Sequence, residues 1–198
     1  MKYIATIEIP KNSDRRIHKG YEDHIKGKFV DFGPISEKIT ANGGRMPVAY
    51  GFIENTLGTD GVPDEIDVMV FSENELKTED SVEVIPFAIM VRQDGDYKVL
   101  AHDNTIIFNS FEEVPVEMQK MLMEFNGFKL PIIEIKKINL KKDIESNKAE
   151  EEVIIKLLLK FDDLIKNKDF ISAENVLKEA LVLQKPIKKY GYIIKLGL

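Results

Sequence analysis

The pattern of apolar and polar positions predicts strands over most of the first 142 residues. Apolar and polar residues nearly alternate from Tyr3 to Ile9, and Pro10 ends this strand because proline cannot donate to a ladder. Similar runs predict strands at "KFVDF", "SEKIT", "VAYGFI" and "IDVMVF", with a turn at "NGG". This part of the chain is therefore expected to be mainly β.

One hairpin and one helix stand out within this part of the chain. The hairpin joins "SVEVIPFAIMVR" to "YKVLAH" through "QDGD", whose Asp-Gly pair suits the positive backbone angles of a type I′ turn. The helix is "PVEMQKMLMEF", with Pro115 at its start and Asn126 and Gly127 as its stop signal. One short helix is thus expected beside the predicted strands.

The spacing of apolar residues changes after the charged segment "KKINLKKDIESNKAEEE", which has no strand pattern. We therefore predict a barrel domain over residues 1–142 and a C-terminal extension over 143–198. In the extension, apolar residues recur at helical spacing, first between Val153 and Ile165 and then between Ala173 and Leu183. We expect a helical hairpin that packs on the main domain or on a neighbouring subunit.

Composition narrows the class of protein. Of the 198 residues, 43% are hydrophobic and 31% are charged, which is typical of a soluble globular protein. The net charge of −6 argues against nucleic acid as a partner. The absence of cysteine excludes thiolate metal sites and cysteine nucleophiles, and leaves His and carboxylates as metal ligands.

Two further features of the sequence bear on location. No apolar run approaches the roughly 18 residues needed to span a membrane, so no membrane partner is expected. The start "MKYIATIEIP" lacks the apolar core of a signal peptide. A cytoplasmic location is therefore expected.

The stretch "DGVPDEIDV" concentrates four acids, Asp60, Asp64, Glu65 and Asp67, in one loop. Like charges at this density repel, and a multivalent cation among them relieves the repulsion. Mg²⁺ prefers oxygen ligands and often sits between carboxylates and a substrate's phosphate groups. The alternative is a solvated turn, since Asp, Gly and Pro are also the residues that turns require.

The order of "IEIPK", "MPVAYGFIENTLGTDGVPDEIDV" and "PFAIMVRQDGDYKVLA" resembles the soluble family I inorganic pyrophosphatases. The most specific part runs from Pro47 to Asp60, where Pro, Tyr-Gly, Ile, Thr-Leu and Asp-Gly recur at the family's spacing without a gap. The resemblance covers about Thr6 to His102. It implies an α+β fold that is mainly β, with a five-stranded OB-like barrel and a flanking helix.

The resemblance also implies an activity: Mg²⁺-dependent hydrolysis of inorganic pyrophosphate, or a similar small phosphoanhydride, by a metal-activated water, in a homo-oligomer. The metal ligands that it implies are Glu8, Asp60, Asp67, Asp94 and Asp96. The substrate-binding residues that it implies are Arg16, Lys38, Tyr50, Lys98 and Lys129. Asp64, Asp67 and Lys98 are expected to act in catalysis.

Several positions depart from the family pattern. The family's middle loop aspartate, which orients the attacking water, is Val62 here, and either Asp64 or Glu65 is a candidate to replace it. The family's helix-end Tyr-Lys pair has no ungapped match, because Asn126 and Gly127 stand there. Phe128 and Lys129 fill its role only after a shift of two residues, which keeps the amine but loses the phenol. The third departure is in the hairpin, where Asp94 is a metal ligand by resemblance or simply a turn residue.

These departures keep other functions open. The main alternative is a catalytically lapsed pyrophosphatase-like protein that binds a phosphate compound or a protein partner. A third hypothesis, an OB-like nucleic-acid binder, conflicts with the acidic composition and with the lack of exposed-looking aromatic pairs on the strands.

Overall fold

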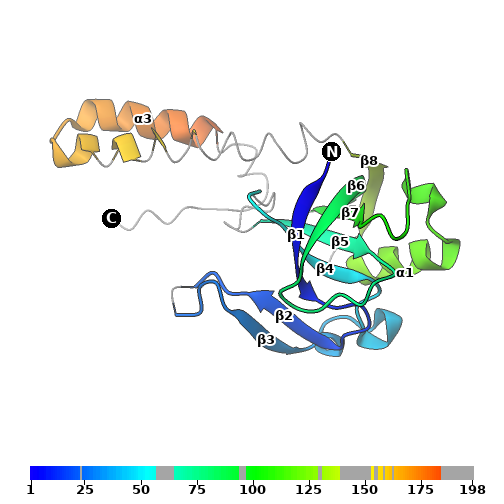
Figure 1. Ribbon diagram of the computed structural model, residues 1–198. Helices are drawn as coiled ribbons and strands as arrows, with labels where there is room; N and C mark the ends of the chain where they lie inside the picture. Colours follow the sequence, from blue (N-terminus) through cyan, green and yellow to red (C-terminus); the bar gives the residue numbers. More distant parts are fainter. Residues whose placement is uncertain are drawn as a thin grey trace.

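The computed structural model describes residues 1–22, 24–56, 65–93, 97–128 and 131–138, together with 153, 156–157, 159–161 and 163–183. Figure 1 shows its elements, which are β1 (Tyr3–Ile9), β2 (Arg15–Lys19), β3 (Phe29–Pro34), η1 (Ile35–Glu37), η2 (Ala41–Gly44), β4 (Ala49–Ile53), β5 (Ile66–Phe71), β6 (Ser81–Arg92), β7 (Tyr97–His102), η3 (Phe111–Glu113), α1 (Val116–Asn126), β8 (Ile132–Lys137) and α3 (Phe170–Leu183). The prediction of a mainly β fold with added helices is confirmed.

Five strands close into a ring in the order β1-β4-β5-β7-β6, because β6 also pairs with β1. The β5–β7 pairing is parallel and the other pairings of the ring are antiparallel. Strand β8 extends the sheet from the far edge of β6, while β2 and β3 form a separate two-stranded sheet. The predicted five-stranded OB-like barrel is therefore confirmed.

Alternating residues of these strands build two cores, one on each face of the sheet. Small and β-branched residues such as Ala5, Ile66, Val68 and Val99 form one buried cluster, as expected for the interior of a narrow barrel. The residues between them on the same strands, such as Leu100, face outward and belong to a second, larger cluster. The outer face of the barrel thus carries a hydrophobic core of its own.

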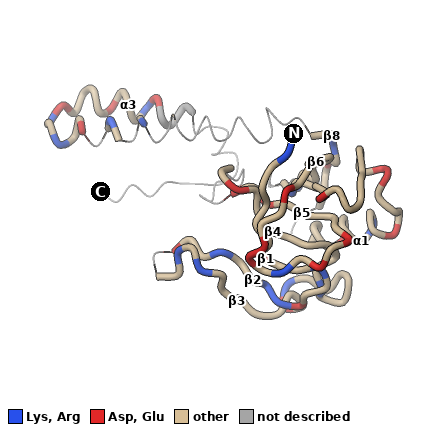
Figure 2. The backbone as a smooth tube through the Cα atoms, viewed as in Figure 1, with Lys and Arg blue, Asp and Glu red and all other residues tan. Residues whose placement is uncertain are grey.

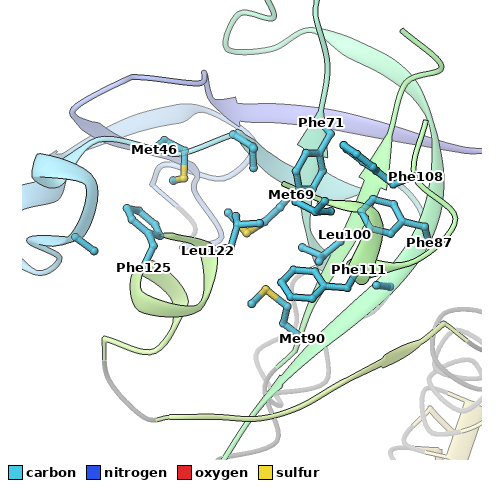
Figure 3. Packing of buried hydrophobic residues seen from close by; sticks show 14 of the residues in the cluster. Met46, Met69, Phe71, Phe87, Met90, Leu100, Phe108, Phe111, Leu122 and Phe125 are labelled. Carbon is cyan, nitrogen blue, oxygen red and sulfur yellow. The ribbon is translucent and has the colours of Figure 1, made fainter. Parts of the chain in front are cut away.

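Helix α1 covers part of this outer face. Leu122 and Phe125 of α1 belong to the outer cluster, and Leu122 points toward Met69 of the sheet (Figure 3). Pro115 stands at the helix start and Gly127 is the C-cap, with its N–H donating to Met123 O at 2.9 Å. The predicted limits of this helix are confirmed.

Most predicted strands are present, with one correction. Strands β6 and β7 pair antiparallel up to Val91 and Tyr97, which confirms the hairpin, although its turn lies outside the described residues. The segment "SEKIT" was expected to be a strand, but the chain forms 3₁₀ turns there. Ile35 and Ile39 are both buried, at a spacing that fits one face of a strand as well as one helical turn. The turn forms here because the N–H groups of Lys38 and Ile39 both donate to Ile35 O at 2.9 Å.

The C-terminal extension forms the predicted helical hairpin. Residues 163–166 end one helix and α3 begins after a turn at 167–169. Lys168 adopts a left-handed φ of 60°, and the Asp169 N–H bonds to Leu164 O at 3.0 Å, which together form a Schellman cap. Asp169 then caps α3 by accepting from the Ser172 N–H at 3.1 Å. None of the described helices is long and apolar enough to cross a membrane.

Gly51 allows β1 and β4 to approach closely. It pairs with Ile7, next to the point where the register of β1 shifts between Ile7 and Ile9. A Cβ atom built on Gly51 would lie 1.9 Å from Thr6 O, a backbone atom that cannot move aside alone. The Tyr-Gly pair of the sequence pattern is therefore required by packing at this position.

The substitution Gly51→Ala is expected to lower the free energy of unfolding by about 3 kcal/mol or more, because it overpacks two hydrogen-bonded strands. Gly27→Ala serves as the control, since Gly27 has a positive φ of 75° but no atom within 4 Å of the added Cβ. It should cost about 1 kcal/mol from backbone strain alone. Urea unfolding measures both, and equal losses would contradict the close approach.

Candidate active site

The described members of the predicted site converge from distant parts of the sequence. They are Glu8 of β1, Arg16 of β2, Lys38 after η1, Tyr50 of β4, Asp67 of β5 and Lys98 of β7. Each lines at least one of two cavities between the outer face of the barrel and the β2–β3 sheet. The two cavities share Arg16, His18 and Tyr50 as a common wall.

The two cavities differ in charge. The basic cavity, of about 250 Å³, is lined by Arg16, Lys38, Arg92 and Lys98, and none of the described residues around it is Asp or Glu. The acidic cavity, of about 510 Å³, is lined by the carboxylates of Glu8, Glu22, Glu65 and Asp67 as well as by Arg16 and Lys19. Figure 2 shows Lys and Arg along β2, and Arg16 and His18 of this strand line both cavities. The site can therefore attract an anion and a cation side by side.

An ion pair between Lys98 Nζ and Asp67 Oδ2 joins the two cavities. The parallel pairing of Val68 with Val99 places these side chains next to each other on the outer face of the sheet. The Lys98 ammonium also lies 5.8 Å from the centre of the Tyr50 ring. Since only 12% of the Lys98 side chain is exposed, the pair has a fixed position at the base of the site.

Glu8 is held in place by β2. It is 4% exposed, and its Oε1 accepts from the Lys19 N–H at 2.7 Å, while Oε2 lies 3.1 Å from Nδ1 of His18. The register shift between Ile7 and Ile9 makes Glu8 the extra residue of a β-bulge, a feature that redirects a side chain. The bulge thus gives the acidic cavity a buried carboxylate.

Glu65, a candidate replacement for the acid missing at Val62, is described and faces the acidic cavity. Its two oxygens accept hydrogen bonds from Lys19 Nζ and from the Tyr21 hydroxyl, each at 2.6 Å. The Lys19 ammonium also lies 4.6 Å from the centre of the Phe52 ring. Glu65 therefore links Lys19 of β2 and the nearby Tyr21 to the barrel.

Arg16 has donors suited to an anion. Its Nη2 donates to Phe32 O, whereas its Nε is buried and has no hydrogen-bond partner among the described atoms. A buried N–H of a charged group without an acceptor is costly, and an oxyanion in the adjoining cavity would relieve that cost. Lys38 is exposed and lines the same cavity. Both residues fit the phosphate-binding role that the sequence assigns to them.

At the end of α1, Asn126 and Gly127 stand where the family pattern has its Tyr-Lys pair. Asn126 is 5% exposed, and its Nδ2 donates to Leu122 O at 2.8 Å and contacts Met69 Sδ at 3.2 Å. Phe128 lines the basic cavity, next to Asn126. The side-chain amide at the position of the family's tyrosine is therefore engaged by the core.

Part of the predicted site lies outside the described residues: Asp60, Asp64, Asp94, Asp96 and Lys129. Within the described ranges, no three His, Asp or Glu side chains are grouped to hold a metal ion. Glu8 and Asp67 nevertheless supply carboxylate oxygens to one cavity, and such hard donors fit Mg²⁺ in kind. They would hold it together with ligands from other segments, for which the loop and hairpin aspartates are the candidates.

Sequence reasoning missed Arg92 and Lys19 and assigned no site role to His18. All three lie on strands, where a charged or polar residue ordinarily marks a solvent-facing position. A signal was available only for β2, where "RRIHK" gathers three cationic residues and a histidine within five positions. Arg92 ends the apolar run of β6 and had no signal of its own.

A closed β-barrel that carries a cationic cavity beside a cavity of carboxylates is suited to binding an anion together with a cation. Residues 5–161 match the inorganic pyrophosphatase family, and the chain belongs to that family. The match extends past the predicted domain boundary at residue 142, which stays a prediction.

Two curated relatives support this assignment. The inorganic pyrophosphatase of Leifsonia xyli subsp. xyli is 34% identical over 103 residues, which cover 50% of this chain and 56% of the relative. The inorganic pyrophosphatase of Nanoarchaeum equitans is 34% identical over 104 residues, which cover 51% and 58% of the two chains. The alignments thus span little more than half the length of these relatives.

Solved structures share the fold at lower identity. The inorganic pyrophosphatase of Ehrlichia chaffeensis has a TM-score of 0.62 at 22% identity, covering 74% of this chain and 92% of that one. The enzyme of Neisseria gonorrhoeae has a TM-score of 0.59 at 21% identity, covering 74% and 88%. At these identities the likeness establishes the architecture alone.

Removing the Glu8 carboxylate tests its structural role. Glu8→Ala leaves the Lys19 N–H without its acceptor and should lower the free energy of unfolding by about 1–3 kcal/mol, whereas Glu8→Gln keeps an acceptor and should cost less. Glu83→Ala, which removes an exposed ion pair with Lys2, should change it by less than about 1 kcal/mol. Urea unfolding compares them, and equal values for the two Glu8 variants would contradict the assigned hydrogen bond.

Proposed function

We propose that the protein hydrolyses inorganic pyrophosphate to phosphate, with Mg²⁺ as its cofactor and water as the nucleophile. The observation that carries the proposal is the separation of charge between the two cavities. A compact polyanion with bound cations needs cationic side chains on one side and carboxylates on the other. Membership of the inorganic pyrophosphatase family supports the same activity.

Different residues of the chain would bind the phosphoryl groups of the substrate and the metal ions. Arg16, Lys38 and Lys98 would bind phosphoryl oxygens and stabilise the charge that builds on them in the transition state. Tyr50, between the two cavities, would contact the same phosphate groups. The ion pair with Asp67 would fix the Lys98 ammonium toward the substrate, so that little reorganisation is needed during the reaction.

Glu8, Asp60, Asp67, Asp94 and Asp96 would hold the metal ions. Bound Mg²⁺ would neutralise charge on pyrophosphate and lower the pKa of a bound water. Asp64 is the residue that we propose to orient this water, as the sequence suggests. Glu65 is the described alternative, and it would first have to give up Lys19 or Tyr21.

One observation favours a second function, binding without hydrolysis. The carboxylate of Glu65, a candidate replacement for the acid missing at Val62, is engaged by two donors, and the amide of Asn126, which stands where the family has its phosphate-binding tyrosine, is turned into the core. A lapsed enzyme would still bind a phosphate compound in the basic cavity. Calorimetric binding of pyrophosphate with no phosphate release would favour this function.

The phosphate-release rate tests the proposed function directly. Release from pyrophosphate should require Mg²⁺ and should fall by at least about 100-fold in Asp67→Asn, because the variant loses a metal ligand and frees Lys98 from its partner. Asp31→Asn, which removes an exposed ion pair with Arg15 outside both cavities, is the control and should retain activity. Tripolyphosphate and nucleotides assayed in parallel define the substrate. No release with any divalent metal would refute the proposal.

We also propose that the protein is a homo-oligomer and that the C-terminal hairpin takes part in assembly. The exposed apolar side chains of Ile165, Phe170 and Ile171 gather near the turn of this hairpin. Deleting the residues after Asn147 should lower the number of 22.6 kDa subunits in the particle, because it removes this surface. Light scattering measures the mass, and an unchanged subunit number would exclude the hairpin from the interface.

A further inference from the structure

Glu8 and His18 form a close polar pair in the acidic cavity. Glu8 Oε2 and His18 Nδ1 lie 3.1 Å apart, and both residues line this cavity. Glu8 is buried, whereas the His18 side chain is 37% exposed and is therefore accessible from the cavity. The metal ligands implied by the family pattern are all carboxylates, so the imidazole adds a donor of a different kind.

The backbone and two aromatic rings hold this pair in place. Lys19, the residue after His18 in β2, donates its N–H to Glu8 Oε1 at 2.7 Å, which ties the carboxylate to the strand that carries the imidazole. The His18 ring meets the Tyr50 ring edge-on at 5.9 Å between centres and lies 6.1 Å from the Phe32 ring. Both aromatic residues line the acidic cavity. The oxygen and the nitrogen are therefore presented together at the wall of this cavity.

The separation of the two atoms suits one shared metal ion. Metal–ligand bonds of about 2.0–2.1 Å place neighbouring ligands about 2.8–3.4 Å apart in octahedral or tetrahedral coordination. The 3.1 Å between Oε2 and Nδ1 falls within this range. An ordinary hydrogen bond has a similar length, so the distance fits a structural pair as well. The two roles differ in one consequence, because only a metal ligand changes which ion the cavity prefers.

The other two histidines of the chain lack this arrangement. His24 Nδ1 lies 3.6 Å from Glu22 Oε2, but both of these side chains are exposed, and His24 lines neither cavity. His102 is buried and stacks on Phe87 of the outer hydrophobic cluster. Of the three histidines, His18 is thus the one that lies beside a proposed metal ligand.

We propose that His18 is a metal ligand and makes one metal position in the acidic cavity prefer a transition-metal ion such as Co²⁺ over Mg²⁺. Imidazole is a good ligand for divalent transition metals, whereas Mg²⁺ takes oxygen ligands. Glu8 Oε2 and His18 Nδ1 would supply two ligands, and Asp67, which lines the same cavity, is a candidate for another. This role of His18 rests on the proposed function, which places metal ions in this cavity.

Calorimetric titration of the full chain with Co²⁺ and with Mg²⁺ tests the preference. Wild-type protein should bind Co²⁺ at least about 10-fold more tightly than Mg²⁺. His18→Asn should weaken Co²⁺ binding by about 10- to 100-fold and change the Mg²⁺ affinity by less than about threefold, because the amide still donates to Glu8 but is a poor metal ligand. His18→Glu, which supplies an oxygen ligand, should bring the two affinities closer together.

His24→Asn is the matched control, since it removes the same kind of His–Glu pair from an exposed histidine that lines neither cavity. Its affinities for Co²⁺ and Mg²⁺ should equal those of wild type. An equal ratio of the two affinities in wild type and His18→Asn would overturn the ligand role and leave His18 as a structural partner of Glu8.

Proton NMR gives a signature of ligation that does not depend on the relative affinities. Co²⁺ is paramagnetic, so the ring protons of a histidine bound to it shift far outside the normal proton spectrum. Shifted ring signals of one histidine should appear when Co²⁺ is added to wild-type protein. They should persist in His24→Asn and disappear in His18→Asn. Their absence from wild-type protein saturated with Co²⁺ would overturn the proposal without reference to any variant.

Phosphate release from pyrophosphate, measured on the same samples, separates this role of His18 from the proposed function. Mg²⁺-dependent release without Co²⁺ ligation by His18 would overturn the metal preference and leave the proposed function standing. Ligation of Co²⁺ by His18 without release under any divalent metal would support the metal preference and contradict hydrolysis. If the protein binds neither Co²⁺ nor Mg²⁺, both fail.

Discussion

The ion pair between Asp67 and Lys98 is the contact on which the site depends. It forms because β5 and β7 run parallel, so that these residues stand side by side on the outer face of the barrel. Lys98 turns toward a cavity of cations and Asp67 toward a cavity of carboxylates. A closed barrel keeps the two strands in register, and the partly buried pair marks the border between the two charge regions.

The second constraint is the way in which polar side chains reach a face that is otherwise hydrophobic. One side of β5 carries Asp67, Met69 and Phe71. Since Met69 and Phe71 belong to the hydrophobic core beneath α1, the site is continuous with that core. Regular strands would send Glu8 and its neighbours to alternating faces only. The β-bulge at Glu8 interrupts the regular pairing of β1, and the Glu8 carboxylate lines the acidic cavity.

Much of the fold followed from short patterns in the sequence. Alternation located β1 and β5, and the motif spacing pointed to Glu8, Tyr50 and Asp67, which line one cavity. The β-bulge that redirects Glu8 has no signature in this alternation. The turns after β3 were missed, since Ile35 and Ile39 suit a strand as well as a helical turn until packing selects one. Arg92 could not be predicted, because its burial depends on pairing with β8, about 40 residues later in the chain.

We expect the anion and the metal to occupy different cavities on either side of the Asp67–Lys98 pair. A crystal structure of the protein with Mn²⁺ in place of Mg²⁺ and with methylenediphosphonate would test it most directly, since anomalous scattering locates Mn²⁺. Mn²⁺ is expected beside Asp67 in the acidic cavity, and at least one phosphonate group is expected among Arg16, Lys38 and Lys98. Phosphonate groups bound entirely away from these cations, or Mn²⁺ with no contact to Asp67, would contradict it.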